Sequence, residues 1–213
     1  DRTEVILFQL RALLEQGLTP RLPIYVDSPM ALAALRVYRR AIREGDHEIA
    51  PRIAGGPDPF DGGNLTEITD VEDSIALADL RGPAIIVSAS GMASGGRVVH
   101  HLARLLPDHH NSVVLVGFQA PGTRGRLLAD GVRQLKMLGR YVPVRAEVID
   151  IGAFSVHADR AELVAWLRRA DREPDMTYVV HGEPKSSEAL VDAIAEQGWA
   201  AVAARQGERV RLD

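Results

Sequence analysis

Two short polar segments combine residue types that suit metal or proton chemistry. An apolar stretch is followed by His181, Gly182 and Glu183, which sets an imidazole and a carboxylate one glycine apart. Farther upstream, His157 follows Ser155 in a second polar stretch. An imidazole can hold a metal ion or move a proton near neutral pH. A histidine after an apolar strand is also commonly a structural hydrogen-bonding group, so both interpretations stay open from these residues alone.

A loop of small residues joins an apolar stretch to a helical pattern over residues 88–97. Such a loop offers backbone N–H groups, the positive end of a helix dipole and a guanidinium to an anion. The candidate phosphate contacts are Ser90, Gly91, Gly95, Gly96 and Arg97. Small residues also permit a tight turn and close packing without any ligand, and the loop by itself leaves the two alternatives equally open.

A second loop, residues 117–126, follows the next apolar stretch and carries Arg124 and Arg126. Because parallel strands bind ligands at their shared carboxyl edge, we expect the two loops to meet and to form a polyanion site. The 213-residue chain has 25 Lys plus Arg against 29 Asp plus Glu, a formal net charge of -4. Such a site would therefore be local, because no general positive surface is expected.

The remaining histidines are set aside as metal ligands. The chain contains no cysteine, so His, Asp or Glu would have to hold any metal. His100 and His101 are adjacent in a helical pattern and would face different directions. His109 and His110 follow a proline in an expected exposed loop, and His47 is set aside with them.

The scaffold for these residues is an alternation of helical and strand patterns. The expected helices cover 3–16, 29–44, 71–80, 95–106, 122–128, 159–169 and 185–197. The expected strands cover 24–26, 66–69, 84–88, 112–116, 142–150, 176–180, 199–203 and 209–212. Continuously apolar strands between amphipathic helices predict an α/β fold with a Rossmann-like parallel sheet covered on both faces.

Three local features complete the expected organisation. Residues 51–64 are rich in proline and glycine and predict a long surface loop. Asp27 and Ser28 are expected to cap the helix at 29–44. Asp159 is expected to cap the helix at 159–169. Residues 142–150 alternate with period two, which predicts a half-exposed edge strand and a change of architecture near residue 148.

Composition favours a folded protein that does not span a membrane. Hydrophobic residues make up 46% of the chain, which is long enough to bury a core. No apolar run approaches the roughly 20 residues that a membrane span needs, and no export signal opens the sequence. We therefore expect a cytoplasmic protein without a membrane partner. The first residue is Asp1, directly in a helical pattern, and we expect an upstream part to be missing.

Four motifs in chain order carry a resemblance to a known family. They are Pro23-Ile24-Tyr25-Val26-Asp27-Ser28-Pro29-Met30-Ala31, then Ser90-Gly91-Met92 with Gly95-Gly96-Arg97, then Phe154-Ser155-Val156-His157-Ala158-Asp159, then Val180-His181-Gly182-Glu183. Together they resemble the β-CASP branch of the metallo-β-lactamase superfamily, and in particular its prokaryotic RNA-processing nucleases. The resemblance implies a β-CASP cap over residues 1–147. It also implies that residues 148–213 are the C-terminal part of a metallo-β-lactamase αββα domain.

The resemblance also implies roles for single residues. His157 matches the family histidine that protonates the leaving oxygen of a phosphodiester, and His181 matches a ligand of a site with two zinc ions. Ser155, Gly182 and Glu183 would lie with the loop residues at the substrate, which would be single-stranded RNA.

Most of the zinc ligands of that family are missing from this sequence. The His-x-His-x-Asp-His motif that supplies them does not occur in the 213 residues. The partner would therefore be an N-terminal half of the metallo-β-lactamase domain, and the chain alone would be inactive. The sequence leaves a homodimer, the choice between RNA and DNA, and endo or exo cleavage open.

Two alternatives from other classes remain at this point. One is a non-catalytic Rossmann-like module that binds a nucleotide or phosphosugar through the loop at 90–97. It predicts binding of a phosphate ligand without a role for His157 or His181. The other is an interaction scaffold, which predicts neither metal nor phosphate binding.

Overall fold

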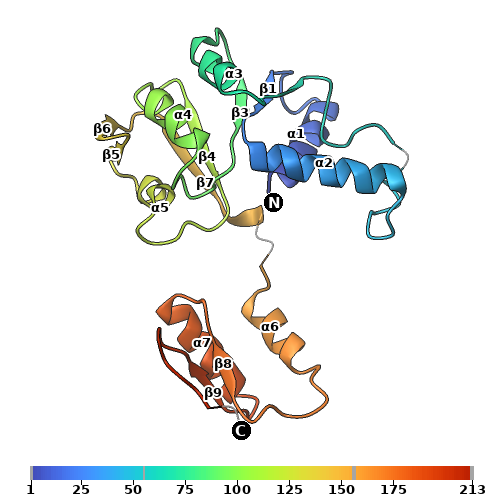
Figure 1. Ribbon diagram of the computed structural model, residues 1–213, viewed down its shortest axis with the longest axis vertical. Coiled ribbons are helices and arrows are strands. Elements are labelled where there is room, and N and C mark those ends of the chain that lie inside the picture. Colours follow the sequence, from blue (N-terminus) through green and yellow to red (C-terminus); the bar gives the residue numbers. More distant parts are fainter. Residues whose placement is uncertain (1, 55, 155–156, 212–213) are drawn as a thin grey trace. The chain divides into compact units, whose positions relative to one another are not determined.

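A computed structural model of the chain describes residues 2–54, 56–154 and 157–211 (Figure 1). The helices are α1 (Arg2–Glu15), α2 (Pro29–Glu44), α3 (Val71–Ala76), α4 (Arg97–Leu105), α5 (Arg124–Ala129), α6 (Arg160–Leu167) and α7 (Pro184–Ala195), with 3-10 turns η1 (Leu77–Asp79) and η2 (Gly152–Phe154). The strands are β1 (Ile24–Val26), β2 (Leu65–Glu67), β3 (Ile85–Val87), β4 (Ser112–Val116), β5 (Gln134–Met137), β6 (Arg140–Pro143), β7 (Glu147–Ile151), β8 (Thr177–Val179) and β9 (Ala201–Ala203). They form two compact units, Asp1–Ser155 and Val156–Asp213.

The first sheet of the N-terminal unit is parallel and has β1 at its centre. Its strand order is β2-β1-β3, and Ile24 of β1 lies opposite Leu65 on one side and Ile85 on the other. The long crossover through α2 allows β1 and β2 to pair in parallel. This arrangement confirms the α/β class with parallel sheets that the sequence predicted.

The second parallel sheet pairs β4 with β7, in the register Ser112 to Glu147. An antiparallel hairpin of β5 and β6 lies between them in the chain. The prediction of a single strand over 142–150 is wrong, because these residues cover the end of β6 and most of β7. The chain turns between these strands, where the backbone N–H groups of Arg145 and Ala146 both donate to the carbonyl of Leu106 at the end of α4.

Two hydrophobic clusters form the core of the N-terminal unit. One lies around β1 and α2 and comprises Leu7, Ile24, Val26, Ala31, Leu32, Leu35 and Phe60. The other lies around α4 and β4 and comprises Ala93, Val99, Leu102, Ala103, Leu106, Leu115, Leu128, Leu135, Met137, Val142 and Ala146. Phe60 comes from the loop expected at 51–64, whose described residues form neither helix nor strand. The loop thus contributes one buried side chain to the core, in addition to its residues at the surface.

The ends of α2 follow from its sequence. The Ser28 hydroxyl accepts a hydrogen bond from the backbone N–H of Ala31 at 3.3 Å, and Pro29 occupies the first turn. Gly45 ends the helix in the left-handed region with φ of 68°, where it donates to the carbonyls of Ala41 and Ile42. The boundaries at 29 and 44 agree with the sequence prediction.

The C-terminal unit contains one parallel pair, β8 with β9, and the helices α6 and α7. Asp159 caps α6 as expected, because its carboxylate accepts from Glu162 N–H while the Glu162 carboxylate accepts from Asp159 N–H, both at 2.8 Å. The strand expected at 209–212 is absent over its described residues 209–211. Every described helix of the chain is too short or too polar to cross a bilayer.

Candidate functional site

A fully buried carboxylate lies directly after β1, where it collects side chains from two helices. Asp27 Oδ1 accepts from Arg97 Nη1 at 2.6 Å. Its Oδ2 accepts from the Ser74 hydroxyl at 2.6 Å and lies 2.6 Å from His101 Nε2. Arg97 begins α4, His101 lies one turn later, and Ser74 lies on α3. We call these four residues the Asp27 cluster.

Hydrogen bonding outweighs burial in setting the charge of Asp27. Burial alone would raise its pKa, but the hydrogen bonds from Ser74, His101 and Arg97 together hold the pKa of Asp27 below its usual value. An ionised carboxylate only accepts hydrogen bonds, so His101 Nε2 must carry the hydrogen of that contact. The cluster is therefore a buried anion surrounded by donors.

The cluster also fixes the loop that precedes α4. Arg97 donates to the carbonyls of Ile68 at 3.2 Å and Thr69 at 3.0 Å, so its guanidinium ties α4 to the segment before α3. The Ser88 hydroxyl donates to the backbone carbonyl of Asp27 at 2.9 Å. Both ends of the loop are thus attached at the carboxyl end of β1.

The sequence predicted the role of one residue of this cluster wrongly and missed the role of another. Asp27 was expected to cap α2, but Ser28 makes the cap and Asp27 makes the buried cluster. His101 was set aside with the other histidines, yet it is buried against Asp27. Asp27 and His101 are 74 positions apart in the sequence. Two features of the sequence could have indicated their pairing: an acidic residue at the end of a strand, and Arg97 and His101 four residues apart on one helix face.

The two glycine-rich loops do meet. Gln119 donates through Nε2 to the carbonyls of Gly91 at 2.9 Å and Gly117 at 3.1 Å, and the Gly125 N–H donates to the Met92 carbonyl at 2.9 Å. A Cβ at position 125 would collide with Gln119 Oε1. Glycine at 125 therefore serves close packing between the loops.

Arg124 joins the two loops and the hairpin. Its Nη1 donates to the carbonyls of Ala93 at 3.3 Å and Ser94 at 3.1 Å, and its Nε donates to the Lys136 carbonyl at 3.0 Å. Arg126 instead pairs with Asp130 on the surface. The guanidiniums of Arg97 and Arg124 are thus both engaged with protein acceptors behind the loop.

The loop backbone itself presents donors at the start of α4. Ser90 and Ala93 have positive φ values, 81° and 54°, which non-glycine residues adopt only when their surroundings hold them there. Gly96 precedes α4 and provides no side-chain cap. The first N–H groups of a helix lack intrahelical partners, so the uncapped turn can accept an anion.

In the C-terminal unit, the predicted residues lie on exposed turns. His181 follows β8 by two residues, is exposed, and has φ of 69°. A Cβ at Gly182 would lie against the Ser187 hydroxyl oxygen, which would have to rotate away. Glu183 precedes α7 and its side chain makes no cap. His157 is exposed on the segment before α6, and Ser155 lies outside the described residues.

Comparison with models of protein families shows which family the chain belongs to. Residues 3–128 match the Beta-Casp domain, and residues 141–204 match the Zn-dependent metallo-hydrolase RNA specificity domain. The chain belongs to the β-CASP branch of the metallo-β-lactamase family. Among the curated β-CASP relatives, it is 38% identical to Ribonuclease TTHA0252 of Thermus thermophilus over 90% of this chain and 43% of that protein.

Two archaeal relatives extend the comparison. The chain is 34% identical to the transcription termination factor FttA of Pyrococcus abyssi, over 79% of this chain and 28% of that protein. It is 32% identical to an RNase J-like protein of Methanocaldococcus jannaschii, over 85% of this chain and 41% of that protein. The chain thus spans less than half the length of these β-CASP relatives.

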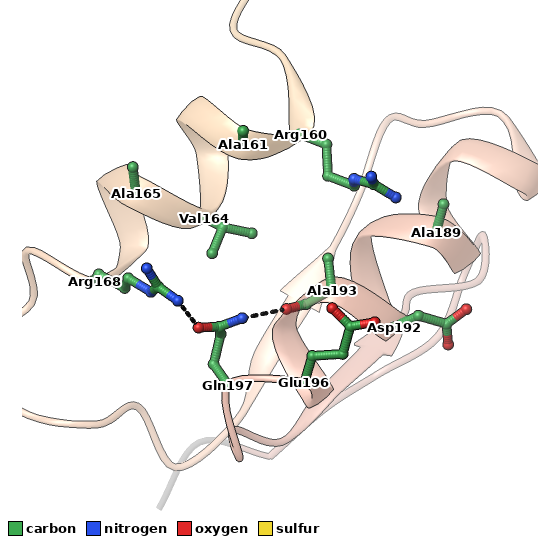
Figure 2. Close-up of a pocket in the computed structure, with 10 residues that line it drawn as sticks. All are labelled: Arg160, Ala161, Val164, Ala165, Arg168, Ala189, Asp192, Ala193, Glu196 and Gln197. Carbon is green, nitrogen blue, oxygen red and sulfur yellow. Dashed lines mark hydrogen bonds between the residues drawn. The ribbon is translucent and has the colours of Figure 1, made fainter.

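A groove of about 440 Å³ opens between α6 and α7 of this β-CASP family member (Figure 2). Its lining residues are Arg160, Ala161, Val164, Ala165, Arg168, Ala189, Asp192, Ala193, Glu196 and Gln197. Figure 2 shows Arg168 donating to the Gln197 side chain, which in turn donates to the Ala193 carbonyl. Neither His157 nor His181 is in this lining, so the groove is not the site that the family motifs indicate.

Proposed function

We propose that this chain is the C-terminal portion of a metal-dependent nuclease that hydrolyses RNA phosphodiester bonds. The observation that carries the proposal is the ordered pair of matches, a Beta-Casp domain followed by a Zn-dependent metallo-hydrolase RNA specificity domain. The alignment with a ribonuclease, which is 38% identical and covers 90% of this chain, supports the same conclusion. In this proposal, residues 1–147 are the β-CASP domain and residues 148–213 belong to the hydrolase domain.

The described residues do not make a zinc site around His181. A zinc ion needs three or four protein ligands, and the described part of the chain offers one group of three suitable residues, which lies elsewhere, at Asp108, His109 and His110. We therefore derive no chemical step through zinc in this chain. His181 would supply one ligand, and an N-terminal half carrying the His-x-His-x-Asp-His motif would supply the others for two ions.

RNA would contact the loop between β3 and α4. Ser90, Gly91, Gly95 and Gly96 would present backbone N–H groups to phosphate oxygens at the uncapped start of α4, an arrangement that favours anions. Arg124 would add positive charge behind the loop, whereas the charge of Arg97 is paired with Asp27, so Arg97 would act mainly by holding the loop's shape. Ser155, Gly182 and Glu183 would also contact the substrate.

His157 would act as the general acid. A protonated imidazole can donate its proton to the oxygen that leaves when a phosphodiester bond breaks, which makes the oxygen a better leaving group. The exposed position of His157 ahead of α6 suits a group that must reach substrate. The enzyme would work in the cytoplasm on single-stranded RNA.

The test compares two substitutions in the longer enzyme. His157→Ala should leave zinc content unchanged and slow cleavage by about 10² to 10⁴, with a smaller loss on a substrate whose leaving group needs no proton. His181→Ala should lower zinc content and recover activity partly in excess metal. His47→Ala, on an exposed loop, is the control and should change neither quantity. Normal activity and zinc content in both variants would contradict the roles of His157 and His181. Absence of both cleavage and bound zinc in the longer enzyme would favour a non-catalytic phosphate-binding module instead.

A further inference from the structure

The loop between α4 and β4 gathers three metal-binding side chains at the surface of the N-terminal unit. Asp108 Oδ1 lies 2.9 Å from His110 Nδ1 and 3.8 Å from His109 Nδ1. One ligand atom from each residue can be chosen so that all lie within 4.8 Å of one another. Among the described residues, this is the one such group of three. His109 and His110 were set aside as metal ligands because the sequence predicts an exposed loop there. The loop is indeed exposed.

The backbone that carries these side chains is already ordered. The Asp108 N–H donates to the Leu105 carbonyl and the Asn111 N–H to the Asp108 carbonyl, both at 3.2 Å. The Asn111 side chain donates to the Leu105 carbonyl at 3.0 Å, and Glu147 N–H of β7 donates to the Asn111 carbonyl at 3.0 Å. A ligand would therefore not have to order the loop, which lowers the entropic cost of binding.

The observed separations fit a small divalent ion. Three atoms at about 2.0–2.1 Å from a tetrahedral metal ion lie roughly 3.3–3.4 Å from one another. His110 Nδ1 lies 2.9 Å from Asp108 Oδ1, in a hydrogen bond that a metal ion would replace, and His109 Nδ1 lies 3.8 Å from it, so the two separations lie on either side of that value. Both imidazoles are largely exposed, so small side-chain rotations can equalise the separations without disturbing the core.

We propose that Asp108, His109 and His110 bind a divalent transition metal ion of the Zn²⁺ or Ni²⁺ type. Imidazole nitrogen is a preferred donor for these ions, whereas Mg²⁺ and Ca²⁺ prefer sites built of oxygen. Water would fill the remaining coordination positions. The site requires no residue of the C-terminal unit, so it is separate from the zinc ligand proposed at His181 and does not depend on the proposed nuclease function.

Bound metal would stabilise the N-terminal unit through this loop. The loop connects the end of α4 to the start of β4, and both elements contribute to the same hydrophobic cluster. A ligand that binds the folded state and not the unfolded chain stabilises the fold in proportion to the logarithm of its concentration. The melting temperature should therefore rise with added Zn²⁺.

The test is calorimetric titration of ZnCl₂ into the 213-residue chain purified without a histidine tag. The wild type should bind one ion and melt at a higher temperature in its presence. The variant H109Q/H110Q should lose more than about tenfold in affinity and the thermal shift, because two ligands are removed. MgCl₂ should give no binding heat.

Two matched controls identify the site. His47→Gln removes an exposed imidazole that lies 3.3 Å from a single carboxylate, Asp46, and should leave zinc affinity unchanged. His100→Gln removes an exposed imidazole on α4 and should also leave it unchanged. Absence of zinc binding in the wild type, equal affinity in H109Q/H110Q, or loss of binding in His100→Gln would overturn the proposal.

Discussion

The two compact units differ sharply in what they bury. The N-terminal unit contains two hydrophobic clusters and the buried Asp27 cluster. Across residues 157–211, the buried side chains are those of Val179, Ser187 and Ile194. Trp166 and Val180 of the same unit are largely exposed. Apolar burial is the main source of folding free energy, so the N-terminal unit should carry most of the stability of the chain.

The proposal divides the chain near residue 148, whereas the compact units are Asp1–Ser155 and Val156–Asp213, and β7 pairs with β4 within the first of them. The parallel pair of β8 and β9 with two helices lacks an extensive core over its described residues. A small unit of that kind is stabilised by contacts with further chain. In the proposal, those contacts come from the N-terminal half of the hydrolase domain.

The largest expected effect tests the buried polar cluster. Asp27→Ala would leave Arg97 and His101 without their carboxylate, and loss of one partner of a buried ion pair costs about 3–5 kcal/mol of unfolding free energy. Urea denaturation followed by far-ultraviolet circular dichroism measures it. Asp130→Ala is the control, because its pair with Arg126 is exposed and is worth about 1 kcal/mol or less.

Fluorescence separates the two units in the same experiment. Both tryptophans of the chain, Trp166 and Trp199, lie in the C-terminal unit. Their transition should occur at lower urea than the main dichroism transition and should not move in Asp27→Ala. A shared transition that shifts for both probes would contradict independent unfolding.

Core truncation should show the same contrast. Leu106→Ala removes a fully buried side chain from the cluster around α4 and should cost about 2–5 kcal/mol. Val202→Ala in β9 trims a partly exposed side chain and should change stability by about 0.5 kcal/mol or less. Similar costs for the two variants would show that the C-terminal unit is packed as well as the N-terminal one.

Packing between the glycine-rich loops should give a smaller effect. Gly125→Ala places a methyl group against Gln119 Oε1, and overpacking of this kind costs about 1–3 kcal/mol. Gly95→Ala, in the neighbouring loop, meets open space and should cost about 1 kcal/mol or less. Melting temperatures of the two variants provide the comparison.

The smallest effect concerns acid stability. Because the pKa of Asp27 is lowered in the folded state, its contribution to stability is present above the unfolded value of about 3.9 and is lost as pH falls through the folded value. The stability difference between wild type and Asp27→Asn should therefore shrink below about pH 4. Denaturation midpoints at several pH values measure this difference, and a difference that grows with acid would contradict the cluster's charge assignment.

Local sequence patterns predicted the elements whose boundaries are set locally. The bounds of β1, α2 and β4 follow from apolar runs, a serine cap and a terminal glycine. The pattern over 142–150 was misleading, because two strands of different sheets keep the same alternation across a turn. That turn depends on hydrogen bonds to the Leu106 carbonyl, which no local pattern reveals.

The candidate site was predictable only in part. The meeting of the two glycine-rich loops was predicted, but from the edge of one shared sheet. The strands before the loops, β3 and β4, lie in different sheets, and the loops meet through Gln119 and Arg124. The buried pairing of Asp27 with His101 could not, because it requires knowing which helix face packs over the end of β1. Arg97 was expected to face an anion, and its contacts with Asp27, Ile68 and Thr69 depend on the same packing.

Cleavage of labelled single-stranded RNA by this chain and by the longer enzyme, each in Zn²⁺, tests the proposed function most directly. The 213-residue chain should give no metal-dependent cleavage, even with zinc bound at Asp108, His109 and His110. The enzyme containing the His-x-His-x-Asp-His half should cleave the RNA and stop when a chelator removes the metal. Metal-dependent cleavage by the chain alone would contradict the proposal.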